Sequence, residues 1–262
     1  MKKLLTILIS AVLVFSFGCK SGQQKTEEKS AQVKQEAPAP DNTLSDTEKS
    51  DGWVLLFDGK TSQGWRGVNK DKFPAGWEIV DGTLHCKGSG MGEAGAADGG
   101  DILYDKDFSN FRLKIDWKIS EGGNSGIFYL GKEVKDWPIY KTAPEMQVLD
   151  NDKHPDALLG KDGNRKAGSL YDLIPANPQN TKKAGEWNTV EIMVYQGTVV
   201  HWQNGEKVLE YHLWTDDWNK LVAGSKFPEL NPDWANVPKS GKIALQDHGN
   251  DVWYRNIKIK EM

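Results

Sequence analysis

Two short segments carry polar side chains whose types suit chemistry on a hydroxyl-rich substrate. Glu145 and Gln147 alternate with apolar residues, so a strand through them turns the acid and the amide to one face while its other face enters the core. Gln246 and His248 follow a second apolar alternation and are expected on a face of the same kind. A carboxylate and an imidazole can take up and deliver protons, whereas an amide can donate to and accept from neighbouring hydroxyls. If these strands are neighbours, the four side chains form one polar surface.

A third segment and several aromatic residues extend this candidate surface. Asn124 opens another strand-like run, and eleven Trp and seven Tyr residues are present in the chain. Aromatic faces stack on the C–H groups of sugar rings. The tryptophans in the loop-rich stretches are the candidates for such stacking: Trp137, Trp214, Trp218 and Trp234. The alternative is that the polar residues only keep the outer face of a sheet soluble, and the pattern alone weighs the two interpretations equally.

The spacing Glu-x-Gln-x-x-Asp, from Glu145 to Asp150, resembles the Glu-x-Asp-x-x-Glu motif of concanavalin-like glucanases. In those enzymes a bulge brings the last acid onto the face of the first. The usual glycosidase mechanism needs two carboxyl groups about 5–9 Å apart. Here the middle acid is an amide and the last acid is the shorter Asp150, so the ordinary two-carboxylate mechanism is disfavoured. Asp150 is kept as a candidate substrate-binding residue.

Period-2 alternation predicts the elements that must position these residues. Residues 111–120 alternate strictly between apolar and polar types, as in a half-buried strand. Asp-Gly at 81–82 and Asn-Gly at 204–205 each separate two β-rich runs and mark tight hairpins. Helical periodicity is almost absent. The pattern therefore predicts an all-β sandwich or jelly roll of antiparallel strands with few short helices in its loops.

Three long loops interrupt the strand pattern, at residues 87–101, 151–168 and 215–240. The last contains one short helical pattern, Thr215–Ala223. Loops of this length in a compact domain are usually functional or mobile. We therefore expect them to rim a single opening.

The N-terminus has the organisation of a bacterial lipoprotein precursor. Residues 1–18 read as a signal peptide, because two lysines precede an apolar run of about fourteen residues, fewer than the about 20 that span a bilayer. Cys19 directly follows a glycine, which resembles a lipobox and predicts diacylation of its thiol. The two residues before that glycine depart from the commonest lipobox residues. An ordinary secretory signal with an incidental cysteine is the alternative.

Composition separates a tether from a folded domain. Residues 19–50 are charged and lack aromatic side chains, which predicts a flexible tether that begins at the lipid anchor on Cys19. All eleven tryptophans lie between residues 53 and 253, so one domain is expected over residues 51–262. Lys20 stands where an Asp would retain many lipoproteins in the inner membrane. The expected location is the outer membrane, facing the periplasm or the cell surface.

Several classes of function lack support in the sequence. The net charge is −4 and no basic stripe is present, so nucleic-acid binding is not expected. The five histidines show no metal-ligand spacing, and Cys86 is expected to be an unpaired core residue. A structural calcium ion, as in related jelly rolls, remains an option without a supporting loop motif. No other metal or cofactor is expected.

Six motifs, in order along residues 52–262, resemble the 3-keto-disaccharide hydrolase family. They are residues 53–60 (WVLLFDGK), 123–127 (GNSGI), 145–150 (EMQVLD), 185–188 (GEWN), 245–249 (LQDHG) and 254–259 (YRNIKI). The resemblance implies a concanavalin A-like jelly roll of two curved sheets and a secreted lipoprotein. It implies cleavage of glycosides already oxidised at C3 by a partner sugar 3-dehydrogenase.

That chemistry suits the candidate residues better than the two-carboxylate mechanism does. A C3 ketone makes the C2 proton acidic, so the group on C1 can leave by elimination and water can add afterwards. Glu145 or His248 is assigned as the base and the other as the acid. Asn124, Gln147 and Gln246 are expected to orient the sugar, with Asp101 and Tyr171 at the rim. Lys226 is a further candidate in a loop, with a plain surface position as the alternative. Two alternatives remain: a carbohydrate-binding lipoprotein without catalysis, and a conventional glycoside hydrolase.

Overall fold

The computed structural model describes residues 39–90 and 99–262. The predicted signal peptide, Cys19 and the first part of the predicted tether lie outside the described residues. Within the described ranges, no helix combines the length and apolar character needed to cross a membrane.

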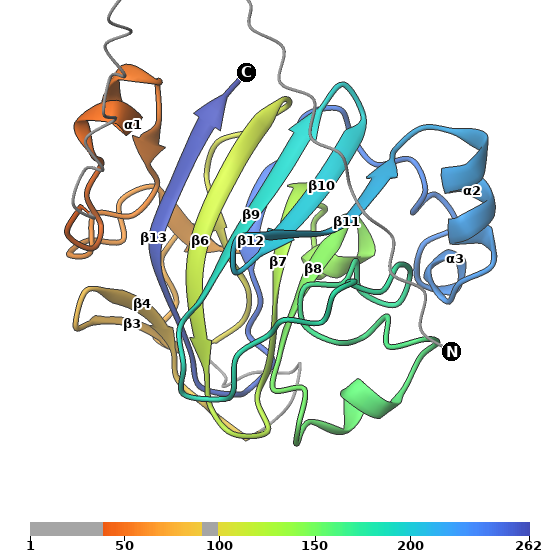
Figure 1. Cartoon of the computed structure of the whole chain (residues 1–262), viewed down its shortest axis with the longest axis horizontal. Coiled ribbons are helices and arrows are strands. Elements are labelled where there is room, and N and C mark those ends of the chain that lie inside the picture. Colours follow the sequence, from red (N-terminus) through yellow and green to blue (C-terminus); the bar gives the residue numbers. More distant parts are fainter. Residues whose placement is uncertain (1–38, 91–98) are drawn as a thin grey trace, which may run out of the picture. The chain divides into compact units, whose positions relative to one another are not determined.

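An eight-stranded antiparallel sheet forms one layer of the fold. Its strands lie in the order β11-β10-β9-β6-β13-β4-β3, with β1 paired to β13, and Figure 1 shows β10, β9, β6 and β13 side by side. The bounds are β1 Val54–Leu55, β3 Trp77–Val80, β4 Thr83–Cys86, β6 Phe111–Ile119, β9 Asn188–Tyr195, β10 Thr198–Gln203, β11 Glu206–His212 and β13 Val252–Glu261.

A five-stranded antiparallel sheet forms the second layer, in the order β2-β5-β12-β7-β8. The bounds are β2 Trp65–Gly67, β5 Ile102–Tyr104, β7 Asn124–Gly131, β8 Glu145–Leu149 and β12 Lys242–Leu245. The two antiparallel sheets and the scarcity of helix confirm the predicted jelly-roll class.

The strands form where the alternation predicted them. In β6 every second side chain is buried, from Phe111 to Ile119, because one face packs in the core and the other meets solvent. The turns at 81–82, 196–197 and 204–205 have positive φ at both central residues, for example 50° at Asn204 and 86° at Gly205. Two such residues make the tight hairpin turn whose twist matches that of the flanking strands.

The core lies between the two sheets and is rich in aromatic side chains. Trp117 of β6 and Tyr254 of β13 face it from the larger sheet, and Tyr129 of β7 faces it from the smaller one. Cys86 is buried and unpaired, as predicted. Trp218 and Trp234 are also buried in this core, each only 2% exposed. The prediction that these two tryptophans are available for sugar stacking is therefore wrong.

Helices are few and short, and α2 and α3 lie together to one side of the sheets (Figure 1). They are α1 Asp46–Ser50, α2 Asp216–Ala223 and α3 Phe227–Leu230, with single 3₁₀ turns η2 Ile139–Lys141 and η3 Pro155–Leu158. The α2 helix begins where the sequence predicted it, with the Thr215 hydroxyl accepting a hydrogen bond from the Trp218 N–H. The α3 helix was not predicted.

The segment before residue 51 packs on the domain and corrects the predicted boundary. The backbone N–H of Asn42 donates to Asn256 Oδ1, and the N–H of Asn256 donates back to Asn42 Oδ1. Arg255 pairs with Asp41, and Lys258 pairs with Glu48 of α1. Since these contacts fix residues 41–48 against β13, the tether predicted over residues 19–50 cannot extend through α1, and the domain begins earlier than residue 51.

A buried histidine joins the two sheets. The Tyr129 hydroxyl lies 2.8 Å from His201 Nε2 and 2.7 Å from the Tyr211 hydroxyl, and His201 Nδ1 lies 3.1 Å from the Gly168 carbonyl oxygen. A proton on Nδ1 satisfies Gly168 and leaves Nε2 to accept from Tyr129. Complete burial lowers the pKa of His201 to about 4, because a charged imidazolium loses its hydration there.

This histidine should make stability depend on pH. Between pH about 6.5 and about 4 the unfolded chain binds a proton at residue 201 that the folded chain does not, so the free energy of unfolding falls as the pH falls through that window, by about 3 kcal/mol. The variant His201→Gln should be less stable at pH 7, but the difference from the wild type should shrink by about this amount at pH 4. Denaturant titrations at both pH values check this, and a difference that stays constant with pH would contradict it.

Candidate active site

The smaller sheet brings the three predicted segments together. β7 lies between β12 and β8, so the strand that Asn124 opens is flanked by the segments that carry Gln246 and Glu145. Met146 and Val148 enter the core, as predicted, so Glu145 and Gln147 lie on the opposite face. The prediction that these strands are neighbours is confirmed by their pairing.

A first cavity, of about 180 Å³, lies on this outer face. Seven residues named from the sequence line it: Asn124, Glu145, Gln147, Tyr171, Lys226, Gln246 and His248. Three further residues complete its wall: Tyr140, Phe227 and Leu230. The last two belong to α3, which explains why a strand pattern could not identify them.

Glu145 is held at the first cavity by a close approach to β7. Its side chain is buried, and its carboxylate lies directly over Gly126 of the neighbouring strand. A methyl group added to Gly126 would lie 2.1 Å from Glu145 Oε1 and 2.7 Å from the carboxyl carbon. The glycine therefore provides the space that this carboxylate occupies.

Two buried amides point to a ligand. Asn124 is 4% exposed and Gln246 is 6% exposed, and their side-chain oxygens, Oδ1 and Oε1, have no hydrogen-bond partner among the described residues. The backbone of Gln246 is fixed, because its N–H donates to the Gly126 carbonyl at 3.0 Å and its carbonyl accepts from the Ser125 hydroxyl at 2.6 Å. A buried acceptor without a donor is costly, and the hydroxyl groups of a bound sugar would satisfy both oxygens.

His248 lies beside a second imidazole. Its ring centroid is 6.0 Å from that of His154, with the rings nearly perpendicular. His154 Nδ1 accepts the backbone N–H of Asp156 at 3.1 Å, so the proton of the neutral ring is on Nε2. Burial, and then the neighbouring His248, lower the pKa of His154. His154 was not identified from the sequence.

A network of charged groups fixes Tyr171 at the cavity wall. The Tyr171 hydroxyl donates to Asp156 Oδ2 and accepts from Lys226 Nζ, each at 3.1 Å. Burial raises the pKa of Tyr171, and the negative charges of Glu145 and Asp156 raise it further. Lys226 also lies 3.6 Å from Asp172. This network places an ammonium group and a protonated phenol at the cavity that contains Glu145.

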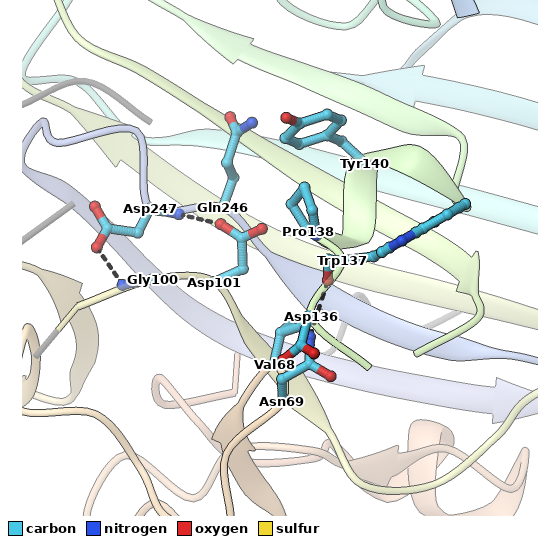
Figure 2. Close-up of a pocket in the computed structure, with 10 residues that line it drawn as sticks. All are labelled: Val68, Asn69, Gly100, Asp101, Asp136, Trp137, Pro138, Tyr140, Gln246 and Asp247. Carbon is cyan, nitrogen blue, oxygen red and sulfur yellow. Dashed lines mark hydrogen bonds between the residues drawn. The ribbon is translucent and has the colours of Figure 1, made fainter. Parts of the chain in front are cut away.

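The other two predicted residues lie elsewhere. Asp101 lines a second cavity, of about 260 Å³, together with Val68, Asn69, Gly100, Asp136, Trp137, Pro138, Tyr140, Gln246 and Asp247 (Figure 2). Asp150 lines neither of these two cavities. Its carboxylate accepts the backbone N–H groups of Gly122 and Asp152, at 2.7 and 3.1 Å. Asp150 therefore fixes two turns, and its position does not support the predicted contact with substrate.

The loop tryptophans differ in their positions. Trp137 is 36% exposed and lines the second cavity. Trp214 is equally exposed but lines neither of these cavities, and its indole N–H donates to the Val237 carbonyl. Among the described residues, no group of three or more His, Cys, Asp or Glu side chains is arranged to hold a metal ion.

Residues 52–260 match the family described as the 3-keto-alpha-glucoside-1,2-lyase-like domain. The chain belongs to this family. It is 50% identical over 276 residues to the 3-keto-disaccharide hydrolase of Bacteroides thetaiotaomicron, an alignment that covers 97% of this chain and 95% of the relative. The resemblance seen in the six motifs is thereby confirmed, and so is the prediction of an enzyme that acts on glycosides.

Solved structures from Parabacteroides distasonis share the fold of this family member. One, provisionally described as a glycosyl hydrolase, is 32% identical with a TM-score of 0.74, covering 85% of this chain and all of that chain. A second, with the same description, is 28% identical with a TM-score of 0.62, covering 80% of this chain and 99% of that chain.

Proposed function

We propose that this protein cleaves the glycosidic bond of 3-keto-glycosides, 3-keto-disaccharides among them, by elimination followed by hydration. The observation that carries this proposal is the first cavity, where the buried Glu145 carboxylate and His248 share a wall with two amide oxygens that lack donors. Both the description of the family and the name of the Bacteroides relative refer to 3-keto sugars. The family description also refers to a lyase, which is the reaction class of an elimination.

The reaction requires a base, an acid and a donor for the enolate oxygen. Glu145 or His248 removes the C2 proton, and the electron pair moves into the C2–C3 bond while the C3 carbonyl becomes an enolate. The enolate then re-forms the ketone, the C1–C2 double bond forms, and the C1–O bond breaks. The other residue of the pair protonates the departing oxygen. Water then adds to C1 and a proton returns to C2, which completes a net hydrolysis.

The residues of the cavity wall suit the remaining steps. Lys226, which donates one of its N–H groups to the Tyr171 hydroxyl, brings further N–H donors to the cavity, and such donors stabilise the negative charge that develops on the C3 oxygen. Asn124, Gln147 and Gln246 orient the sugar through its hydroxyl groups. The second acid of the glucanase-like spacing, Asp150, fixes turns instead. This arrangement supports elimination over the two-carboxylate mechanism.

A release assay tests this function. The protein is incubated with 3-keto-trehalose or 3-keto-lactose and, separately, with the unoxidised sugars, and free monosaccharide is measured. We expect release from the keto sugars only, because the C2 proton is acidic only beside a ketone. Release from the unoxidised sugar would indicate a conventional glycosidase. Binding without release would indicate a carbohydrate-binding lipoprotein.

The cellular setting is a further part of the proposal. We propose that residues 1–18 are removed and that Cys19 is lipidated, which would anchor the domain at the outer membrane, facing the periplasm or the cell surface. The support is the apolar run followed by Gly18-Cys19 and Lys20. A 3-keto substrate must come from an oxidation at C3, so a sugar 3-dehydrogenase is the expected pathway partner. Labelling with a fatty acid that Cys19→Ser abolishes would support the anchor.

A further inference from the structure

The second cavity adjoins the first. Tyr140 and Gln246 line both of them, so the two cavities meet at these side chains. The pairing of β5 with β12 explains the arrangement, because it places Asp101, which precedes β5, beside Gln246, which follows β12. A ligand that extends from the first cavity past Gln246 would therefore enter the second.

The lining of the second cavity suits a sugar ring. Figure 2 shows the Asp101 carboxylate on one side of the cavity and Trp137, Pro138 and Tyr140 on the other. A pyranose has hydroxyl groups at its edge and C–H groups on its faces, so it matches polar acceptors on one side and an aromatic ring on the other. Gln246, with its side-chain oxygen lacking a donor, stands where the cavities meet.

The walls of the second cavity are fixed before any ligand binds. Glu133 accepts two hydrogen bonds from Arg66, at 2.7 and 2.8 Å, and one from the backbone N–H of Asn69, at 2.7 Å. The side-chain Nδ2 of Asn69 donates to the backbone carbonyl of Trp137 at 2.9 Å. These contacts join the loop after β2 to the loop that carries Trp137.

The opposite wall is fixed in the same way. The backbone N–H of Asp247 donates to Asp101 Oδ1 at 2.9 Å, and the N–H of Gly100 donates to Asp247 Oδ2 at 2.7 Å. A site whose walls are already in place loses less freedom when it binds.

We propose that the second cavity is the subsite for the leaving sugar of a disaccharide. The keto ring occupies the first cavity, the glycosidic oxygen lies near Gln246 and Tyr140, and the departing sugar stacks on Trp137 with its hydroxyl groups toward Asp101. This inference rests on the proposed function and adds the place of the leaving sugar and the two residues that recognise it, Trp137 and Asp101.

A change of substrate tests the subsite. The values of kcat/KM are measured for 3-keto-trehalose and for methyl 3-keto-α-glucoside, whose methyl group cannot fill the second cavity. Trp137→Ala should lower the ratio of the first value to the second by about tenfold, because binding energy from a remote part of a substrate contributes to kcat/KM. Asp101→Asn, which keeps the size of the side chain, should change the ratio in the same direction.

The control is Trp214→Ala, which removes an equally exposed tryptophan that lines neither of these cavities. It should leave the ratio unchanged. Activity of each variant on the methyl glycoside shows that it is folded. If Trp137→Ala lost activity equally on both substrates, or on neither, the proposed subsite would be contradicted and the proposed function would stand. A wild-type protein that releases nothing from either substrate would contradict the proposed function and with it the subsite.

Discussion

Glu145→Gln and His248→Asn should each lower the turnover of a 3-keto-disaccharide by about 10²–10⁴. Both substitutions keep the approximate size of the side chain but remove its ability to exchange a proton at neutral pH. Glu145 is buried at the first cavity, so a buffer ion from the solution cannot take its place beside the sugar. The loss should appear in kcat, because proton transfer belongs to the chemical step. Initial rates of monosaccharide release at saturating substrate measure it.

The fold of each variant needs an independent check. Thermal unfolding should remain close to that of the wild type, since neither substitution leaves a void in the core between the sheets. If both variants turned over the 3-keto-disaccharide within a few-fold of the wild type, the assignment of Glu145 and His248 as the acid–base pair would be wrong.

Gly126→Ala should lower turnover by about 10² or more although it changes no ionisable group. The added methyl group would lie 2.1 Å from Glu145 Oε1, closer than any real contact, so the carboxylate must move away from its position at the cavity. A displaced carboxyl group loses its alignment with the C2 proton or with the departing oxygen, and acid–base catalysis depends on that alignment. The measurement is kcat for monosaccharide release, compared directly with that of Glu145→Gln.

Gly224→Ala is the matched control for this substitution. It adds the same methyl group at the C-terminal end of α2, where the nearest atoms are 3.6 and 3.7 Å away, ordinary contacts. Activity of Gly224→Ala should stay near the wild-type value. If Gly126→Ala retained full activity, Glu145 either would not need its observed position or would not take part in the reaction.

The larger sheet follows from the sequence more directly than the smaller one. In β6 a strict alternation marks a strand with one face in the core. In the same sheet, the Asp-Gly pair marks the hairpin between β3 and β4, and the Asn-Gly pair marks the hairpin between β10 and β11. In β7, by contrast, every residue is buried, because one face meets the core and the other is covered by a second apolar cluster, in which Phe128 packs with Ile139 and Ala143. A strand covered on both faces loses the alternation by which strands are recognised. Short strands such as β1, β2 and β5 have too few residues to show a period.

Much of the candidate site could be predicted because it lies on strands. Alternation places Glu145 and Gln147 on one face, and the pairing of β7 with β8 and β12 adds Asn124 and Gln246. The short helical segments η2 and α3 contribute Tyr140, Phe227 and Leu230, whose positions depend on tertiary contacts that no local pattern records. The role of Gly126 likewise depends on the register between two strands.

Two differences between expectation and structure have a common physical origin. The chemical type of Asp150 suits a contact with substrate, but in the structure its carboxylate accepts backbone N–H groups of two turns. Trp218 and Trp234 lie in a loop-rich stretch, but they pack in the core beneath it. In both cases the side chain stabilises the backbone around the site. Residue type shows what a side chain can do, and only its neighbours show which of those roles it performs.

The fate of the hydrogen at C2 tests the elimination mechanism most directly. A 3-keto-disaccharide with hydrogen at C2 is turned over in D₂O, the reaction is quenched early, and the released 3-keto sugar is examined for deuterium bound to C2. Unreacted substrate and free product, incubated in parallel, correct for spontaneous exchange. The mechanism assigned to Glu145 and His248 predicts deuterium at C2 in the released sugar. Product that retains its original C2 hydrogen would contradict the elimination.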